Sequence, residues 1–313
     1  MAMRYIESEA GLGKFSNDSD KAKAGLANSI SGAAKTWRER YGDIDLPAET
    51  ASSTAPLPYR AQSVWVERVA TLPSKDQLVE QAQKVWKTES IAAPSDEFFD
   101  IWSKALKEGF PHFQPVYYKD VVFTADSNWL GKGIKPNDFF WRSIKDGYLA
   151  GDAAALNEGW ALFESVQRPK YRVGKQMYGR DERMGSILKT GRKEGKIHVP
   201  DWCKHVPDTS RAGVSADEVD NFVIPEVAKV LRDEATDWGV PRAIEFNMAG
   251  NLYLPKLGDT NTWELFGDKF GHGRRLIGGY SVDSGLAFVG CNTSGNHLDN
   301  VGFRLQRKFP SKA

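Results

Sequence analysis

Cysteine is scarce in this sequence. Cys203 and Cys291 are the only two cysteines among 313 residues, and they lie far apart in the chain. Small secreted domains have closely spaced cysteines that form a disulfide framework, and this pattern is different. One disulfide between the two is possible, but the composition favours two thiols in a reducing compartment.

Long apolar segments are also missing. No run in the sequence approaches the roughly 20 apolar residues that a helix needs to cross a bilayer. Residues 1–7, MAMRYIE, do not lead into an apolar stretch and a small-residue cleavage site, as a signal peptide would. We therefore expect no membrane span and no signal peptide. The expected location is the cytoplasm, or the virion if a phage encodes the protein.

Neither sign of charge is in excess. The 42 Lys and Arg residues nearly balance the 41 Asp and Glu residues, so the chain has no overall field that would attract nucleic acid or an anionic membrane. Any partner must be recognised locally, and we expect an unknown protein or surface ligand. Aromatic residues, in contrast, are plentiful. Ten Trp and sixteen Phe residues predict a large folded core.

Signatures of catalysis are few. The histidines are scattered and do not form a metal-binding pattern at helical spacing; they are His112, His198, His205, His272 and His297. Residues 11–14, GLGK, resemble a phosphate-binding loop, but Phe15 stands where Ser or Thr would ligate magnesium. We expect no metal site, no cofactor and no catalytic residue.

Residues 1–110 are expected to form an N-terminal helical region with a Pro/Ser-rich linker. Asn17 to Tyr41 follows the pattern of a capped amphipathic helix. The linker is rich in Pro, Ser, Thr and Ala and extends from Leu46 to Pro58. Ser74 to Lys87 and Pro94 to Gly109 each carry apolar residues at spacings of three and four, which predicts two further helices.

Residues 111–313 are expected to form a second domain that mixes strands and helices. The pattern predicts short strands at 116–118 and 121–123, and helices at 152–167 and 215–238. Ser215 and Glu218 have the spacing of a capping box, and Pro225 predicts a kink or a late start in the last helix. After Gly239 we expect only strands and loops.

Four blocks between Val240 and Leu305 carry the strongest signal in the sequence. They are VPRAIEF at 240–246, NTWELFGD at 261–268, RLIGG at 275–279 and VGFRL at 301–305. Their order and spacing resemble the C-terminal half of the C-type-lectin-like fold shared by formylglycine-generating enzymes and by the variable proteins of diversity-generating retroelements. This resemblance implies an α+β fold, with residues 111–313 forming a C-type-lectin-like domain.

The same blocks supply residues that we expect to build a scaffold. Trp263 and Phe303 are expected in the core, and Glu264 is expected to be a buried or rim acceptor. Arg304 is expected to anchor a loop through charge-assisted hydrogen bonds, and Gly278 and Gly279 to allow a tight turn.

Residues 280–300 lie where the retroelement family places its variable ligand-binding residues. The segment contains no Lys, Glu, Gln, Met or Trp, the five residues that NNY codons cannot encode when adenines of AAY codons are randomised. A Gly/Ser/Asn-rich connecting loop would show the same absences, but the position favours a recognition surface. The predicted ligand-binding residues are Tyr280, Asp283, Ser284, Phe288, Cys291, Asn292, Ser294, Asn296 and His297.

Two alternatives to a non-enzymatic binding protein stay open. A formylglycine-generating type of oxidase would need two neighbouring cysteine thiolates, and Cys291 has no second cysteine within 280–300. The iron enzymes that share this fold carry a His-x3-His-x-Glu pattern, which this sequence lacks. The other alternative is a purely structural phage component.

Overall fold

The computed structural model describes residues 72–281 and 285–310. The predicted helix at 17–41, the linker at 46–58 and the predicted site residues Asp283 and Ser284 lie outside these ranges. Contacts within the chain place all of the described residues in one compact unit. Within the described part, no helix has the length and apolar character needed to span a membrane.

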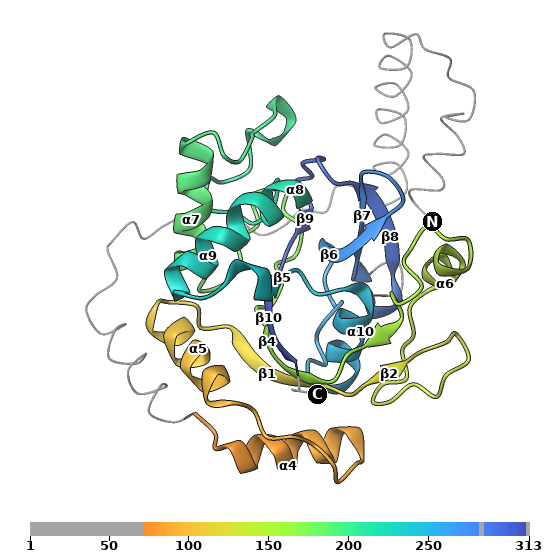
Figure 1. The fold of residues 1–313 in the computed structure, drawn as a ribbon. Helices are drawn as coiled ribbons and strands as arrows, with labels where there is room; N and C mark the ends of the chain where they lie inside the picture. Colours follow the sequence, from red (N-terminus) through yellow and green to blue (C-terminus); the bar gives the residue numbers. More distant parts are fainter. Residues whose placement is uncertain (1–71, 282–284, 311–313) are drawn as a thin grey trace, which may run out of the picture. The chain divides into compact units, whose positions relative to one another are not determined.

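The described residues form an α+β structure with short strands (Figure 1). The helices are α4 (Lys75–Trp86), α5 (Asp96–Lys107), α6 (Asp138–Lys145), α7 (Glu182–Lys193), α8 (Ala216–Glu218), α9 (Ile224–Leu231) and α10 (Ala243–Leu252). Single-turn elements are η2 (Asp201–Cys203), η3 (Val219–Val223), η4 (Ala235–Asp237) and η6 (Gly285–Ala287). The strands are β1 (Phe113–Tyr118), β2 (Val121–Val122), β3 (Ala155–Leu156), β4 (Gly159–Glu164), β5 (Trp238–Gly239), β6 (Trp263–Phe270), β7 (Arg274–Gly278), β8 (Val289–Thr293), β9 (Val301–Gly302) and β10 (Gln306–Pro310).

Helices α4 and α5 confirm the predicted helices at 74–87 and 94–109. Ser74 and Ser95 accept hydrogen bonds from backbone N–H groups of the first turns, which explains why both helices begin there. Trp102 of α5 donates its indole N–H to the carbonyl oxygen of Phe113 at 3.0 Å. The two helices therefore share a core with β1, beside which Figure 1 draws them.

The first sheet has the order β1-β4-β10-β5 and is antiparallel throughout. Its strand β4 overturns the predicted helix at 152–167. Leu156, Trp160 and Phe163 have helical spacing, but every residue of β4 is buried. A strand that is flanked by two others and covered on both faces has an almost continuous apolar run. Some apolar residues in such a run lie three or four positions apart by chance, which imitates the pattern of a helix.

The predicted helix at 215–238 is interrupted and shorter than expected. Ser215 forms the predicted capping box with Glu218. A π-turn, η3, follows, and α9 then begins with Pro225 in its first turn, where a missing N–H costs least. The helix ends at Leu231 because Arg232 adopts a left-handed conformation.

Helix α10 contradicts the expectation of only strands and loops after Gly239. All of its residues except Leu252 are buried. Its polar residues Glu245, Asn247 and Asn251 are buried as well, so the helix has no exposed polar stripe and periodicity does not reveal it. Its first turn is held by Asp268, whose Oδ2 accepts the N–H of Ala243 at 2.6 Å.

The second sheet carries Cys291 and Asn292, and the other predicted site residues that the structure describes lie in the segments before and after β8. The strand order of this sheet is β8-β7-β6-β9, with β6 and β9 parallel and the other pairs antiparallel. Helix α10 lies against it, and the rings of Phe246 and Phe266 pack 5.0 Å apart between helix and β6. Figure 1 shows this sheet in blue beside α10. Strands β6 to β9 form a mixed sheet, as the resemblance implies for an α+β fold, but α10 lies within the same C-terminal region and β10 joins the first sheet.

Candidate functional site

Three aromatic side chains form a cluster at one end of the second sheet. Trp263 opens β6 and is only 8% exposed, which confirms its predicted burial. Tyr280 stacks on the indole with centroids 4.9 Å apart, and Phe288 meets it edge-on at 4.7 Å. Both outer rings are half-buried. A fixed indole thus supports two rings that are partly accessible to a ligand.

The turn at Gly278 and Gly279 leads the chain into Tyr280. Gly279 has φ +75°, a conformation that favours glycine. A Cβ atom at Gly278 would lie 2.3 Å from the carbonyl oxygen of Phe288, so no larger residue fits. Arg168 donates to the Gly278 carbonyl at 3.4 Å and to the Gly279 carbonyl at 2.5 Å. Gly279 therefore gives the chain a left-handed residue directly after β7, and a buried guanidinium holds both carbonyls in place; the tight turn stays a prediction.

A buried ion cluster anchors the neighbouring strands. The Glu264 carboxylate is fully buried and accepts a hydrogen bond from Arg304 Nε at 2.5 Å, while Arg168 Nε lies 3.3 Å from it. Burial alone would raise the pKa of Glu264, but Arg304 and Arg168 hold this pKa below its ordinary value. Phe303 is also fully buried. These positions agree with Phe303 as a core residue and with a loop-anchoring Arg304, and of the two expected places for Glu264, buried or at the rim, the structure shows the buried one.

Strand β8 places two predicted residues on opposite faces of the sheet. Cys291 pairs with Leu276, and Asn292 pairs with Arg275. Because side chains alternate along a strand, Cys291 shares the face of Leu276, whereas Asn292 shares the face that carries Trp263. Cys291 therefore does not extend the aromatic cluster.

The loop after β8 packs against helix α8. Ser294 Oγ lies 3.0 Å from the Asp217 carboxylate, and His297 Nε2 lies 2.9 Å from the Glu218 carboxylate. Asn296 donates its side-chain amide to that of Asn292 at 2.9 Å. These predicted ligand-binding residues contact the scaffold through polar groups, and Asn296 is also exposed. The predicted residues thus form an aromatic end and a polar end, with β8 between them.

Sequence reasoning did not identify Trp202 as part of this surface. Trp202 lies in η2, is 66% exposed, and donates its indole N–H to the His297 carbonyl at 3.1 Å. His205, three residues later, lies 3.0 Å from Asp299. The available signal was a tryptophan among polar residues, DWCKH, without strand or helix periodicity. It adds an exposed aromatic ring at the polar end.

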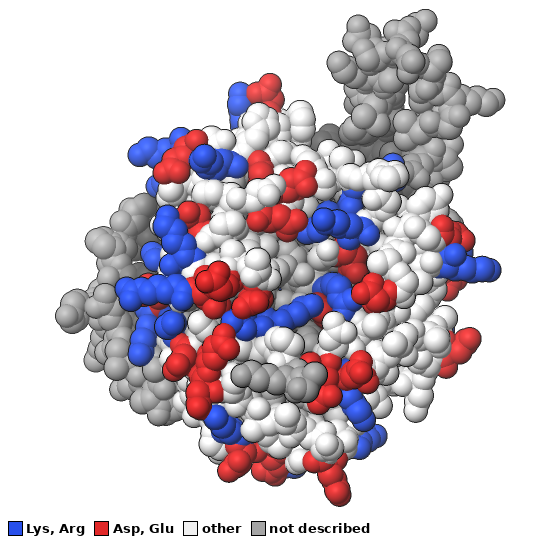
Figure 2. All heavy atoms as spheres, viewed as in Figure 1, with Lys and Arg blue, Asp and Glu red and all other residues white. Residues whose placement is uncertain are grey.

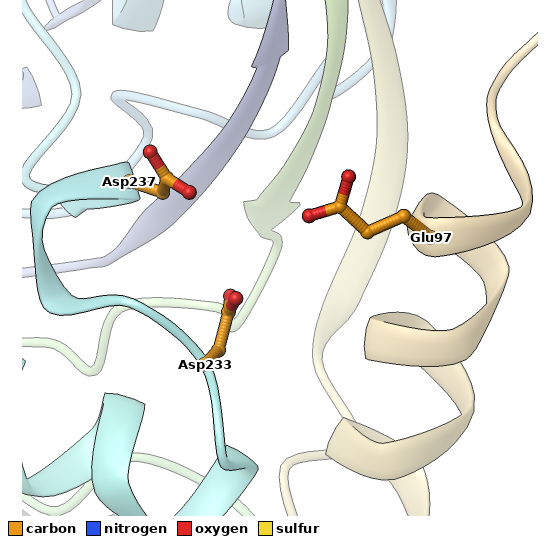
Figure 3. Close-up of side chains that lie close together, drawn as sticks. All are labelled: Glu97, Asp233 and Asp237. Carbon is orange, nitrogen blue, oxygen red and sulfur yellow. The ribbon is translucent and has the colours of Figure 1, made fainter.

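The described residues contain one group of carboxylates close enough to suggest a metal, namely Glu97, Asp233 and Asp237 (Figure 3). Arg307 satisfies this group instead. Its Nη2 lies 2.6 Å from Glu97 and 3.0 Å from Asp237, and its Nε lies 3.1 Å from Asp233. Trp238 also donates to Asp233 at 2.8 Å. The arrangement is an ion cluster that joins α5, η4 and β10.

Charge on one face of the protein gives no further indication of a site. On the face shown in Figure 2, acidic and basic side chains are interspersed, which agrees with the balanced composition.

Comparisons of this chain with models of known protein families, with curated proteins and with solved structures gave no match.

Proposed function

We propose that this protein is a non-enzymatic ligand-binding protein of the type found as variable proteins of diversity-generating retroelements. In this proposal residues 280–300 form its recognition surface on a C-type-lectin-like fold. The observation that carries it is the pair of half-buried rings, Tyr280 and Phe288, held on a buried Trp263. Aromatic rings fixed in this way offer contact area with little loss of conformational entropy on binding.

The scaffold around this segment supports the same interpretation. Arg168 fixes the backbone just before Tyr280, and Arg304 and Glu264 form a buried pair behind it. A surface of this kind can change its exposed side chains with small effects on stability, because exposed positions away from caps and cores usually matter by less than about 0.5 kcal/mol. This combination suits a recognition protein.

Sequencing the gene across a population of closely related clones tests the retroelement assignment. We expect substitutions to concentrate at adenine-derived codons within 280–300, with Trp263, Gly279 and Arg304 unchanged. Substitutions spread evenly along the gene would contradict the assignment and leave a structural component as the better interpretation.

Binding can be tested by affinity capture from host cells or membranes followed by titration of the captured partner. Replacing Tyr280 and Phe288 together with Ala should weaken binding by more than about tenfold, because buried aromatic residues often dominate interfaces. Tyr148→Ala is the matched control, since Tyr148 is 56% exposed and belongs to another loop. Equal affinity of the double variant and the control would refute the proposed surface. Copper-dependent oxidation of a cysteine peptide would instead favour the oxidase alternative.

A further inference from the structure

A cavity of 270 Å³ lies beside the Gly278-Gly279 turn, on the side of Arg168. Its wall comes from segments far apart in sequence: residues 165–168 after β4, residues 254–258 after α10, Gln114 of β1, and Arg304 between β9 and β10. This volume is just below the range of about 300–1,000 Å³ typical of pockets for drug-sized ligands. The cavity therefore suits a small ligand.

The cavity is charged and apolar inside and polar at its rim. Arg168 and Arg304 line it and are only 4% and 2% exposed. Val166 and Leu257 add buried apolar wall. The rim residues are exposed: Gln114, Gln167, Pro255 and Lys256. A ligand that enters with a charged group first would meet both guanidinium groups and leave its apolar part against the aliphatic wall.

Arg168 has hydrogen-bond donors to spare. A guanidinium has five N–H groups. Among the described residues, those of Arg168 meet Gly278, Gly279 and Glu264, which leaves one N–H on each terminal nitrogen. Two such donors match the two oxygens of a carboxylate, which arginine often binds in a bidentate way.

The charges around the cavity favour an anion. Arg168 and Arg304 share the single carboxylate of Glu264. A neighbouring ion cluster has the opposite imbalance, because its single Arg211 forms ion pairs with both Glu164 and Asp181. Burial lowers the pKa of Arg168, Glu264 opposes this effect, and the charge of Arg304 adds to it. The cavity side of the ion cluster thus carries an excess of positive charge on two buried side chains.

We propose that this cavity binds a small monocarboxylate with a short apolar body. Its carboxylate lies against Arg168 and Arg304, and its apolar part packs on Val166 and Leu257. The site is separate from the aromatic cluster and does not depend on the proposed function of residues 280–300. Because Arg168 also holds the Gly279 carbonyl, a bound acid would share its anchor with the turn that leads to Tyr280.

Calorimetric titration of the full chain with matched acids and amides tests this proposal. Benzoate and isovalerate should bind saturably with Kd values near or below about 1 mM, and benzamide and isovaleramide at least about tenfold more weakly. The amides have the same shape without the charge. No saturable binding of either acid up to about 10 mM, or equal binding of acids and amides, would overturn the proposal.

Three variants locate the binding within the protein. Leu254→Trp places an indole at a half-buried cavity position and should abolish binding of benzoate. Lys256→Glu reverses a charge at the exposed rim and should weaken it several-fold, with little effect on folding. Lys119→Glu is the matched control, at an exposed position after β1 and outside the cavity wall, and should leave binding unchanged. The site is refuted if both cavity variants fold and still bind benzoate as the natural chain does. It is also refuted if Lys256→Glu and Lys119→Glu lose the same amount of benzoate affinity.

Discussion

Asp268 offers a sharp test of how α10 is held against the second sheet. The side chain is 7% exposed and caps the first turn of α10 by accepting the N–H of Ala243. Burial raises the pKa of Asp268 from 3.8 to about 6, although the Ala243 N–H and the Arg242 charge both oppose the rise. Asp268→Asn keeps an acceptor oxygen at this position and removes the titratable proton.

The sign of the effect follows from proton linkage. Because the folded state binds the Asp268 proton more tightly than the unfolded state, this carboxyl destabilises the fold as pH rises from 3.8 to about 6. A difference of about 2 pKa units at about 1.4 kcal/mol per unit gives about 3 kcal/mol. The free energy of unfolding of Asp268→Asn minus that of the natural chain should therefore increase by about 3 kcal/mol between about pH 3 and pH 7.

Urea denaturation followed by tryptophan fluorescence, at a series of pH values, measures this difference. The subtraction removes the acid sensitivity of other buried carboxylates, such as Glu264, because both proteins contain them. Asp120→Asn is the control for the same substitution at the surface, since Asp120 is exposed in the loop after β1; the change with pH should be clearly larger for Asp268→Asn. A flat difference for Asp268→Asn, or one that falls as pH rises, would refute the reasoning.

Three further substitutions test the scaffold. Trp263→Ala should lower the free energy of unfolding, measured in urea, by about 3–5 kcal/mol because it removes a buried ring. Tyr280→Ala should lower this free energy clearly less. Equal losses would contradict the distinction between scaffold and surface. Glu264→Gln should cost about 3–5 kcal/mol in the same assay, since it leaves buried guanidinium groups without their carboxylate; a loss below about 1 kcal/mol would contradict this. Gly279→Ala should lower the melting temperature more than Gly147→Ala. Both glycines have φ +75°, but only at Gly279 would the added Cβ be crowded, 3.0 Å from the Phe246 ring. Equal shifts in melting temperature would show that this crowding is unimportant.

Local signals in the sequence predicted local structure well. The helix start at Ser215 was predicted from the spacing of a capping box, and the helices at 74–87 and 94–109 were predicted from apolar residues three and four positions apart; both signals depend on a few neighbouring residues. Strand β4 and helix α10 could not be predicted in this way, because their burial on all sides is decided by distant segments. A periodic pattern of apolar residues arises where one face of an element lies on the core and the other faces solvent. Neither β4 nor α10 has a solvent-facing side, so neither shows the pattern.

The candidate site shows the same division. The buried Trp263 and the turn at Gly279 followed from residue type and from the blocks around them. Exposed Trp202 was missed because its place beside His297 depends on a contact between segments that are far apart in sequence. The separation of Cys291 from Asn292 depends on strand register, which a loop-like composition did not reveal.

The position of β10 has a consequence for synthesis on the ribosome. Strand β10 pairs with both β4 and β5 and so lies inside the first sheet, yet it is translated after residues 280–300. The first sheet therefore cannot close until the ribosome has passed this segment. A premature stop or frameshift within 280–300 removes β10 and leaves β4 and β5 with unpaired edges, which are prone to aggregation and proteolysis. Only chains that are translated in frame through residues 280–300 can complete the first sheet.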